Sequence, residues 1–120
     1  MNGMEGNTKK KWVLRLRASD AATIQAIKAR KKIVETRAAT AKYRDVKKGD
    51  TLVIVCGKQR FERTIKTARH FKSIAALFKA VPYKKIMPYA ATAAEARATY
   101  YGYPGYREKL KKYGVFASWI

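Results

Sequence analysis

The chain has 120 residues, of which 28 are Lys or Arg and 8 are Asp or Glu, so its formal net charge is +20. This length predicts one domain with its own core, at residues 12–120, after a flexible basic lead-in at residues 1–11. The single cysteine excludes an intrachain disulfide, and no apolar run approaches the roughly 20 residues that span a bilayer. The polar start lacks the apolar centre of a signal peptide. We therefore expect an intracellular protein, cytoplasmic or nuclear, with no membrane partner.

In the first half of the domain the sequence predicts strands around one helix. Apolar alternation, β-branched residues and a near-continuous apolar run predict three strands, at residues 12–17, 33–37 and 51–56. Ser19 or Asp20 offers an N-cap for a short helix that ends near residues 29–30. Residues 38–48 are expected to form a polar loop.

The second half begins with a turn at Gly57-Lys58, and the alternation that follows predicts the return strand of a hairpin at residues 61–68. Ser73 can cap a short helix, and Thr92 with Glu95 has the spacing of a capping box. The elements expected here are helices at residues 74–80 and 93–101, an irregular segment at 83–89, a helical turn at 106–112 and a last strand at 115–120. This order predicts an α+β protein, a small barrel-like sheet of about five to six mixed strands capped by short helices.

Metal and cofactor chemistry has no support in the sequence. The chain has one histidine, His70, and one cysteine, Cys56, whereas a structural zinc needs four ligands and a catalytic zinc three. Cys56 ends an apolar strand, where a free cysteine is usually a small buried hydrophobe. No glycine-rich phosphate loop of standard spacing occurs. We expect neither a metal nor a cofactor.

The densest cluster of charged residues runs from the end of the first helix into the second strand, at residues 30–37. Strand alternation places Glu35 and Arg37 on one face, with Thr36 on the other. Glu35 and Arg37 can pair and direct the guanidinium toward a phosphate or a base edge, and Lys32 can point into the same cleft. The alternative is a solvated surface ion pair, worth at most about 1 kcal/mol.

The overall charge favours an anionic partner. Cations are dispersed through the folded-looking segments, which is typical of a nucleic-acid-binding surface. Eight tyrosines are present; most should pack in the core, and one or two of Tyr43, Tyr83 and Tyr103 should be free to stack on bases. The residues we expect to contact RNA or another single-stranded nucleic acid are Arg30, Lys31, Lys32, Glu35, Arg37, Lys42, Tyr43, Arg44, Tyr83 and Tyr103.

Several of these features together resemble one family. A helix leads through a basic turn into Lys32-x-x-Glu35-x-Arg37, and a polar loop ending in Gly49-Asp50 precedes an apolar strand. The aromatic segment at residues 100–106 and the closing residues 113–117 complete the likeness. In this order and spacing, residues 12–120 resemble the ASCH domain of the PUA-like superfamily. The resemblance implies a β-barrel with a cleft beside the first helix, lined by Lys32, Glu35 and Arg37, and a role in RNA binding.

The chain departs from that family at two places. Arg30 stands where members usually carry a glycine that favours a left-handed helix end. Some small bacterial members resemble amidohydrolases that act on an acetylated cytidine through a Lys, a Thr and a distant Glu. Lys32 matches the Lys, but Glu35 stands at the Thr position, Thr36 should face away, and residues 88–94 offer no carboxylate.

Three functions remain open at this stage. The first is an RNA-binding module, expected to be a monomer, that holds single-stranded or structured RNA across the basic cleft. The second is a hydrolase acting on RNA (a ribonuclease) or on a modified cytidine, with Lys32 and Glu35 as its candidate catalytic residues. The third is a protein-interaction adaptor.

Overall fold

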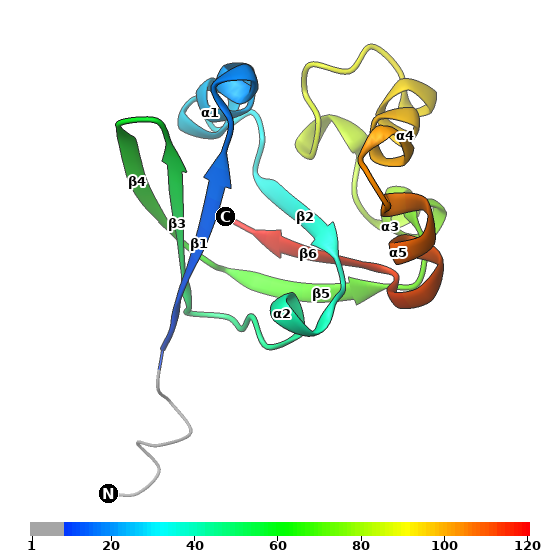
Figure 1. Ribbon diagram of the computed structural model, residues 1–120, viewed down its shortest axis with the longest axis horizontal. Coiled ribbons are helices and arrows are strands. Elements are labelled where there is room, and N and C mark those ends of the chain that lie inside the picture. Colours follow the sequence, from blue (N-terminus) through cyan, green and yellow to red (C-terminus); the bar gives the residue numbers. More distant parts are fainter. Residues whose placement is uncertain (1–8) are drawn as a thin grey trace, which may run out of the picture.

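The six strands form two separate three-stranded sheets (Figure 1). The computed structural model describes residues 9–120, so residues 1–8 of the expected lead-in lie outside the described residues. The first sheet has the order β1-β3-β4 and the second the order β2-β6-β5. Their bounds are β1 Lys11–Leu16, β2 Val34–Ala38, β3 Thr51–Cys56, β4 Gln59–Thr64, β5 Thr67–Phe71 and β6 Val115–Trp119.

Strand pairing is mixed. β1 runs parallel to β3, with Lys11 opposite Thr51 and Leu16 opposite Cys56, and the parallel connection passes through α1 as such a crossover requires. The other three pairs, β3 with β4, β2 with β6 and β5 with β6, are antiparallel. β1, β4, β2 and β5 are therefore edge strands.

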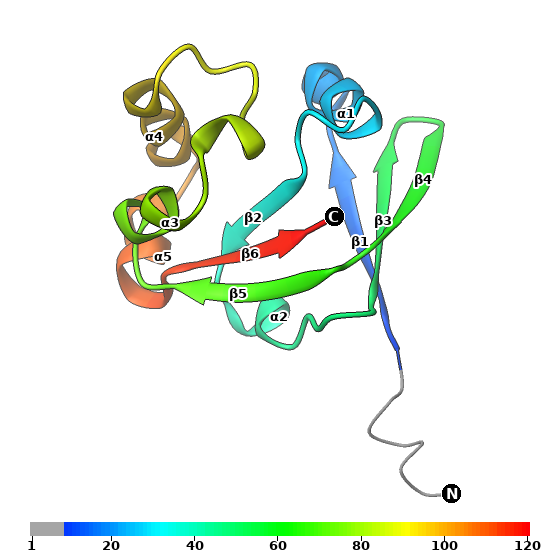
Figure 2. The ribbon, with the colours of Figure 1, turned by 180° about the vertical axis from the view of Figure 1, so that it is seen from behind.

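Five helices accompany the sheets: α1 Ala21–Lys28, α2 Ala41–Arg44, α3 Ile74–Ala80, α4 Ala93–Gly102 and α5 Tyr106–Tyr113. Short 3-10 turns lie at Ala18–Asp20 and Tyr83–Lys85. Figures 1 and 2 show that α3, α4 and α5 gather at one end of the second sheet, whereas α1 lies over the first sheet. The longest helix of the described chain, α4, has ten residues, so no helix in residues 9–120 can cross a membrane.

The core is divided between the two sheets. One cluster packs α3, α4 and α5 against the second sheet, with Leu77, Tyr100 and Val115 nearly inaccessible. The other cluster packs α1 against the first sheet around Ile24 and Ile54, and Ala68 of β5 and Phe116 of β6 also pack against it. This second cluster therefore joins the two sheets.

The prediction of a closed barrel is wrong. β4 continues into β5, which joins the sheets on one side, but no ladder pairs β1 with β2 on the other side within the described chain. The alternation of apolar residues indicates which side chains face a core, but not which strand edges pair with each other. Here β1 and β2 do not pair, and charged side chains line the cleft between them. The expected return strand at residues 61–68 is correspondingly two strands, which part at Ile65–Lys66.

Most other elements lie where the sequence predicts them. Ser73 Oγ accepts a hydrogen bond from the Ala76 amide (3.1 Å) at the start of α3, and Thr92 Oγ1 accepts from the Glu95 amide (3.1 Å) at the start of α4. The expected loop at residues 38–48 contains the short helix α2, and β1 starts at Lys11, one residue before the predicted domain start. Arg30 adopts the left-handed conformation itself (φ 62°), so the chain makes this turn without the glycine.

Candidate nucleic-acid interface

A polar cleft of about 350 Å³ lies at the open seam between the two sheets, where β1 and β2 approach without pairing. We call it the tyrosine cleft. Its wall contains the side chains of Arg15, Leu16, Arg17, Asp20, Thr23, Lys32, Glu35, Thr36, Arg37, Met87, Tyr89, Tyr100, Tyr103, Pro104 and Tyr106. The volume falls within the 300–1,000 Å³ range typical of small-molecule sites.

The floor of the cleft is an ion triad on and beside β2. Lys32 Nζ lies 3.3 Å from Glu35 Oε1, and Arg37 Nε lies 3.6 Å from Glu35 Oε2. Glu35 and Arg37 point the same way because they are two residues apart on one strand, and Lys32 approaches from the turn before it. The triad carries one net positive charge at the base of the cleft.

Lys32 is held by the backbone as well as by Glu35. Its side chain is buried, and Nζ donates hydrogen bonds to the carbonyl oxygens of Ile86 (2.7 Å) and Val34 (3.2 Å). An ammonium group has three donors; these two carbonyls take two of them, and the Glu35 carboxylate adds an ion pair at 3.3 Å. The lysine therefore fixes the position of Glu35 and ties β2 to the segment before α4.

Arg37 stays charged and directs part of its guanidinium to open space. Burial alone would lower the pKa of Arg37, but Glu35, together with Tyr106 and Tyr43, raises it, and the net shift is upward. Its Nε is buried with no hydrogen-bond partner and only the longer ion pair to Glu35. The fork remains available to an incoming acceptor such as a phosphate oxygen.

Part of the cleft lining is aromatic. Tyr89 and Tyr103 are among the most exposed large apolar side chains of the described chain, at 48% and 38%. Tyr103 packs edge-on against Tyr100 and Tyr106, with ring centroids 6.4 and 5.2 Å apart, so its ring is held in place. Burial raises the pKa of Tyr103, Tyr89 and Glu35 raise it further, and Arg37 opposes them. The Tyr103 hydroxyl therefore stays protonated at neutral pH.

Thr36 and Tyr100 close the back of the cleft. Their hydroxyl groups form a buried hydrogen bond, and burial is the main cause that raises the pKa of Tyr100. As strand alternation predicts, Thr36 lies on the face of β2 opposite Glu35. It nevertheless reaches the tyrosine cleft, because β2 is an edge strand whose two faces meet at its rim.

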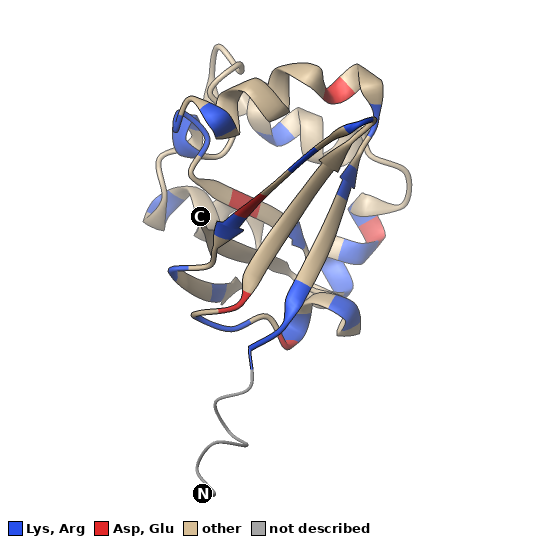
Figure 3. Ribbon diagram, turned by 90° about the vertical axis from the view of Figure 1, so that its left-hand side faces the viewer, with Lys and Arg blue, Asp and Glu red and all other residues tan. Residues whose placement is uncertain are grey.

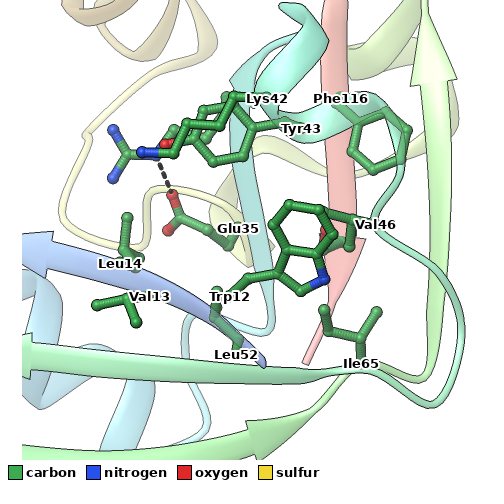
Figure 4. A pocket seen from close by; sticks show the side chains of 12 residues that line it. Trp12, Val13, Leu14, Glu35, Lys42, Tyr43, Val46, Leu52, Ile65 and Phe116 are labelled. Carbon is green, nitrogen blue, oxygen red and sulfur yellow. Dashed lines mark ion pairs between the residues drawn. The ribbon is translucent and has the colours of Figure 1, made fainter. Parts of the chain in front are cut away.

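Two further hollows adjoin the cleft. An outer groove of about 430 Å³ follows the edge of β1 and is lined by residues 11–15, Arg37, Lys42 and Tyr43; it shares Arg15 and Arg37 with the tyrosine cleft. Beneath Tyr43 a mainly apolar pocket of about 40 Å³ reaches toward Trp12 and Phe116, with the Glu35–Arg37 ion pair at its rim (Figure 4). That pocket has room for only a few water molecules, so the cleft and the outer groove are the sites for a larger ligand.

The predicted contact residues divide into two groups. Lys32, Glu35, Arg37 and Tyr103 line the tyrosine cleft, and Lys42 and Tyr43 line the outer groove. The others lie elsewhere and line neither: Arg30, Lys31, Arg44 and Tyr83.

The four that lie elsewhere have other surroundings. The Arg30 guanidinium donates to the Ile120 carbonyl oxygen (3.0 Å), which turns it toward β6. Tyr83 packs against Phe78 and donates its hydroxyl to the Ala91 carbonyl oxygen (2.9 Å). Lys31 and Arg44 are exposed on the turn after α1 and on α2.

Sequence reasoning missed several lining residues, chiefly Arg15, Arg17 and Tyr89. The alternation of β1 places Arg15 opposite the buried Leu14, which identifies it as outward-facing but not as facing a cleft. Figure 3 shows that the central strand β3 carries no charged residue, whereas its neighbours do: β1 carries Lys11 and Arg15, and β4 carries Arg60, Glu62 and Arg63. The sequence alone does not show that β1 is an edge strand, and this position is what brings Arg15 to the cleft.

Metal ligands do not gather anywhere in residues 9–120: no group of three or more His, Cys, Asp or Glu side chains lies close enough to hold an ion. The single cysteine and the single histidine each have other surroundings. Cys56 is buried in the first-sheet core, and His70 Nε2 lies 2.7 Å from the Tyr113 carbonyl oxygen.

Comparison with known proteins finds similar solved structures, among them two proteins whose names state no activity. No family model matches the chain, and no curated protein matches it. The crystal structure of hypothetical protein PH0355 is similar with a TM-score of 0.79 and 29% identity, over 92% of this chain and 96% of that chain. The solution structure of protein PF0455 from Pyrococcus furiosus is similar with a TM-score of 0.71 and 29% identity, over 92% and 94%. Neither name states a ligand or a reaction.

Proposed function

We propose that this protein binds single-stranded RNA, with an unpaired base in the tyrosine cleft and the backbone along the outer groove. The observation that carries the proposal is the pairing of a cationic floor with an exposed aromatic wall in one cleft. Four cationic and two acidic side chains line it, together with Tyr89 and Tyr103. Proteins that bind single strands combine these two elements, since cations neutralise phosphates and aromatic rings stack on bases.

The outer groove gives the strand a path. Arg15 and Arg37 belong to both hollows, and Lys11 and Lys42 extend the positive charge beyond them. A base in the cleft therefore has cations on the side from which the phosphates enter. We retain the ASCH resemblance as part of this proposal, because the motif residues Lys32, Glu35 and Arg37 all line the cleft.

Fluorescence anisotropy with a labelled 12-nucleotide RNA, measured from 50 to 300 mM KCl, tests this function. The logarithm of the affinity should fall with the logarithm of salt by about 0.7 per neutralised phosphate. Arg15→Gln should weaken binding and reduce that slope by about 0.7. The matched control is Arg97→Gln, an exposed arginine on α4 that lines neither hollow.

Either of two results would contradict the proposal: an affinity that does not change with salt, or an equal loss in the Arg97→Gln control. Because Arg15 is exposed and makes no ion pair at 4.0 Å or less within residues 9–120, its replacement should leave the fold intact. Thermal unfolding of both variants checks this point.

A hydrolase acting on RNA or a modified nucleoside is the second candidate, favoured by the buried Lys32–Glu35 pair in a cleft. Lys32 would act there as an electrostatic stabiliser, since two of its three donors already bind backbone carbonyl oxygens. Incubation with RNA and with acetylated cytidine, followed by chromatography, tests this function. Turnover by the wild type that Lys32→Met abolishes while RNA affinity persists would support it, and absence of turnover on both substrates would contradict it.

A further inference from the structure

Glu35 is a group that can only accept hydrogen bonds, placed at the base of a cleft that four cationic side chains and one other acid, Asp20, also line. Its side chain is 12% exposed and lines the tyrosine cleft. A carboxylate offers about four lone-pair positions, two on each oxygen. Lys32 Nζ lies 3.3 Å from Oε1 and Arg37 Nε lies 3.6 Å from Oε2, both as ion pairs, so at most one position on each oxygen is taken. Each oxygen therefore keeps one position for a ligand.

A pair of adjacent acceptors selects among the four RNA bases. The Watson–Crick edge of guanine presents two neighbouring donors, N1–H and the 2-amino group, at the spacing of the two carboxylate oxygens. Cytosine and adenine each place an amino group beside a ring nitrogen that accepts, and uracil places one N–H between two carbonyl oxygens. An acceptor opposite a carboxylate is repelled and loses its water without compensation. Only guanine satisfies both oxygens.

The surroundings of Glu35 suit a bound base. Lys32 and Arg37 hold the carboxylate from two sides, so little conformational freedom is lost when a ligand binds. Tyr103 has a packed, partly exposed ring in the same cleft, and Tyr89 is still more exposed. Reading the edge of an unpaired base while stacking on its face is the common mode of sequence-specific RNA recognition.

We propose that the tyrosine cleft binds an unpaired guanine, with its Watson–Crick edge on the Glu35 carboxylate and its ring against Tyr89 or Tyr103. This inference rests on the proposed function and adds the identity of the base. The flanking phosphates would then lie toward Arg15 and Arg37, which the cleft shares with the outer groove.

Oligouridylates of seven nucleotides with one variable central base test the inference by fluorescence anisotropy at 100 mM KCl. We expect the guanine-containing oligomer to bind about 5- to 150-fold more tightly than those with cytosine, adenine or uracil, the range for one bidentate contact to a base edge. Inosine lacks the 2-amino group and should lose most of this preference. 7-Deazaguanine keeps the whole Watson–Crick edge and should retain it.

The outcomes separate this inference from the proposed function. If none of the oligomers binds, the RNA-binding function itself is contradicted. If all bind equally, or if another base is preferred, the guanine inference is overturned while RNA binding stands. A guanine preference that inosine retains also overturns it, because the 2-amino group would then make no contact.

Glu35→Gln supplies the test from the side of the protein. The amide replaces one acceptor by a donor, so we expect the preference for guanine to disappear while the binding of plain oligouridylate persists. The control is Glu62→Gln on β4, an exposed carboxylate that lines neither hollow. A guanine preference that survives in a folded Glu35→Gln variant would overturn the inference, and if that variant does not fold, the inosine comparison decides alone.

Discussion

The two sheets meet at two seams that differ in almost every respect. At the closed seam β4 passes directly into β5: the Ile65 amide donates to the Asp50 carbonyl oxygen (2.8 Å), and the Lys66 amide donates to the Trp119 carbonyl oxygen (2.8 Å). Ile65 is thus bound to the end of the first sheet, and its neighbour Lys66 to the second sheet. At the open seam β1 and β2 share no ladder within the described chain, and the tyrosine cleft lies between them.

Under the proposed function, the closed seam contributes to stability and the open seam to binding. At the closed seam the Ile65 and Lys66 amides bind backbone carbonyl oxygens, and the Asp50 carboxylate accepts three hydrogen bonds. At the open seam the charged side chains of Lys32, Glu35 and Arg37 pair with one another, and the outer nitrogens of the Arg37 guanidinium and one position on each Glu35 oxygen remain for a ligand. Substitutions at the two seams should therefore have different consequences.

The largest effect is expected at the triad. Lys32→Ala leaves the Glu35 carboxylate and the Ile86 and Val34 carbonyl oxygens without their buried partner. We expect the free energy of unfolding to fall by about 3–5 kcal/mol, as for other broken buried pairs, in urea titration. Lys31→Ala, at the exposed neighbouring position, should change it by less than about 0.5 kcal/mol. A similar small loss for both variants would show that the triad is a solvated surface pair.

At the closed seam the decisive side chain is Asp50. It accepts hydrogen bonds from the Trp12 indole (2.8 Å) and from the Lys10 and Lys47 amides (3.1 and 3.0 Å). Asp50→Asn should lower the free energy of unfolding by about 2–3 kcal/mol at pH 7, because a charged acceptor is lost. RNA affinity should not change, since Asp50 lines neither the cleft nor the outer groove.

The same aspartate gives a pH dependence. Burial alone would raise the pKa of Asp50, but the indole, the two amides and Lys9 lower it, and the net shift is downward. A carboxylate with a lowered folded pKa adds stability in full above its unfolded pKa of about 3.9, and that stability is lost as the pH falls through the folded value. The difference between wild type and Asp50→Asn should therefore shrink below about pH 4, and a constant difference would contradict this assignment.

Stacking in the open seam should affect binding alone. Tyr89→Leu and Tyr103→Leu should each weaken RNA binding by about 1–3 kcal/mol if the ring stacks on a base. Tyr101→Leu is the matched control, because Tyr101 is comparably exposed but lies outside the cleft and faces Arg107. Equal affinities for all three variants in the anisotropy assay would remove the aromatic wall from the interface.

The smallest effect is expected at the back of the cleft. Thr36→Val removes the buried hydrogen bond to the Tyr100 hydroxyl at nearly constant volume. It should cost about 1 kcal/mol of unfolding free energy. A double-mutant cycle with Tyr100→Phe measures the pair directly, and additive losses would mean that the two hydroxyl groups do not interact.

Much of the secondary structure was predictable because local signals define it. The caps at Ser73 and Thr92 and the turn at Gly57-Lys58 occur where expected, since each satisfies a backbone need within a few residues. The division between β4 and β5 was not predictable, because apolar alternation continues through the buried Ile65. Nor could alternation show that the edges of β1 and β2 stay apart, which is a property of tertiary packing.

The part of the site formed by residues close in sequence was predictable, and the part assembled by the fold was not. Lys32, Glu35 and Arg37 lie together because their spacing along one turn and strand already brings them close. Tyr89 and Arg15 join them only through the fold, as the segment before α4 and the edge of β1 reach the seam. We predicted Arg30 as a contact residue because it lies in the same charged segment of the sequence. Its backbone is left-handed, and its side chain binds the Ile120 carbonyl oxygen instead.

The cationic edges have a consequence for how the molecules behave in crowded solution. An uncovered strand edge is a template on which a second copy can add its own strand. β1 presents Lys11 and Arg15, and β4 presents Arg60 and Arg63 with one acid, Glu62. Both edges therefore carry a net positive charge, and two copies that approach edge to edge repel each other over about a Debye length. Added salt, or a long anionic polymer that bridges several copies, weakens this protection against aggregation.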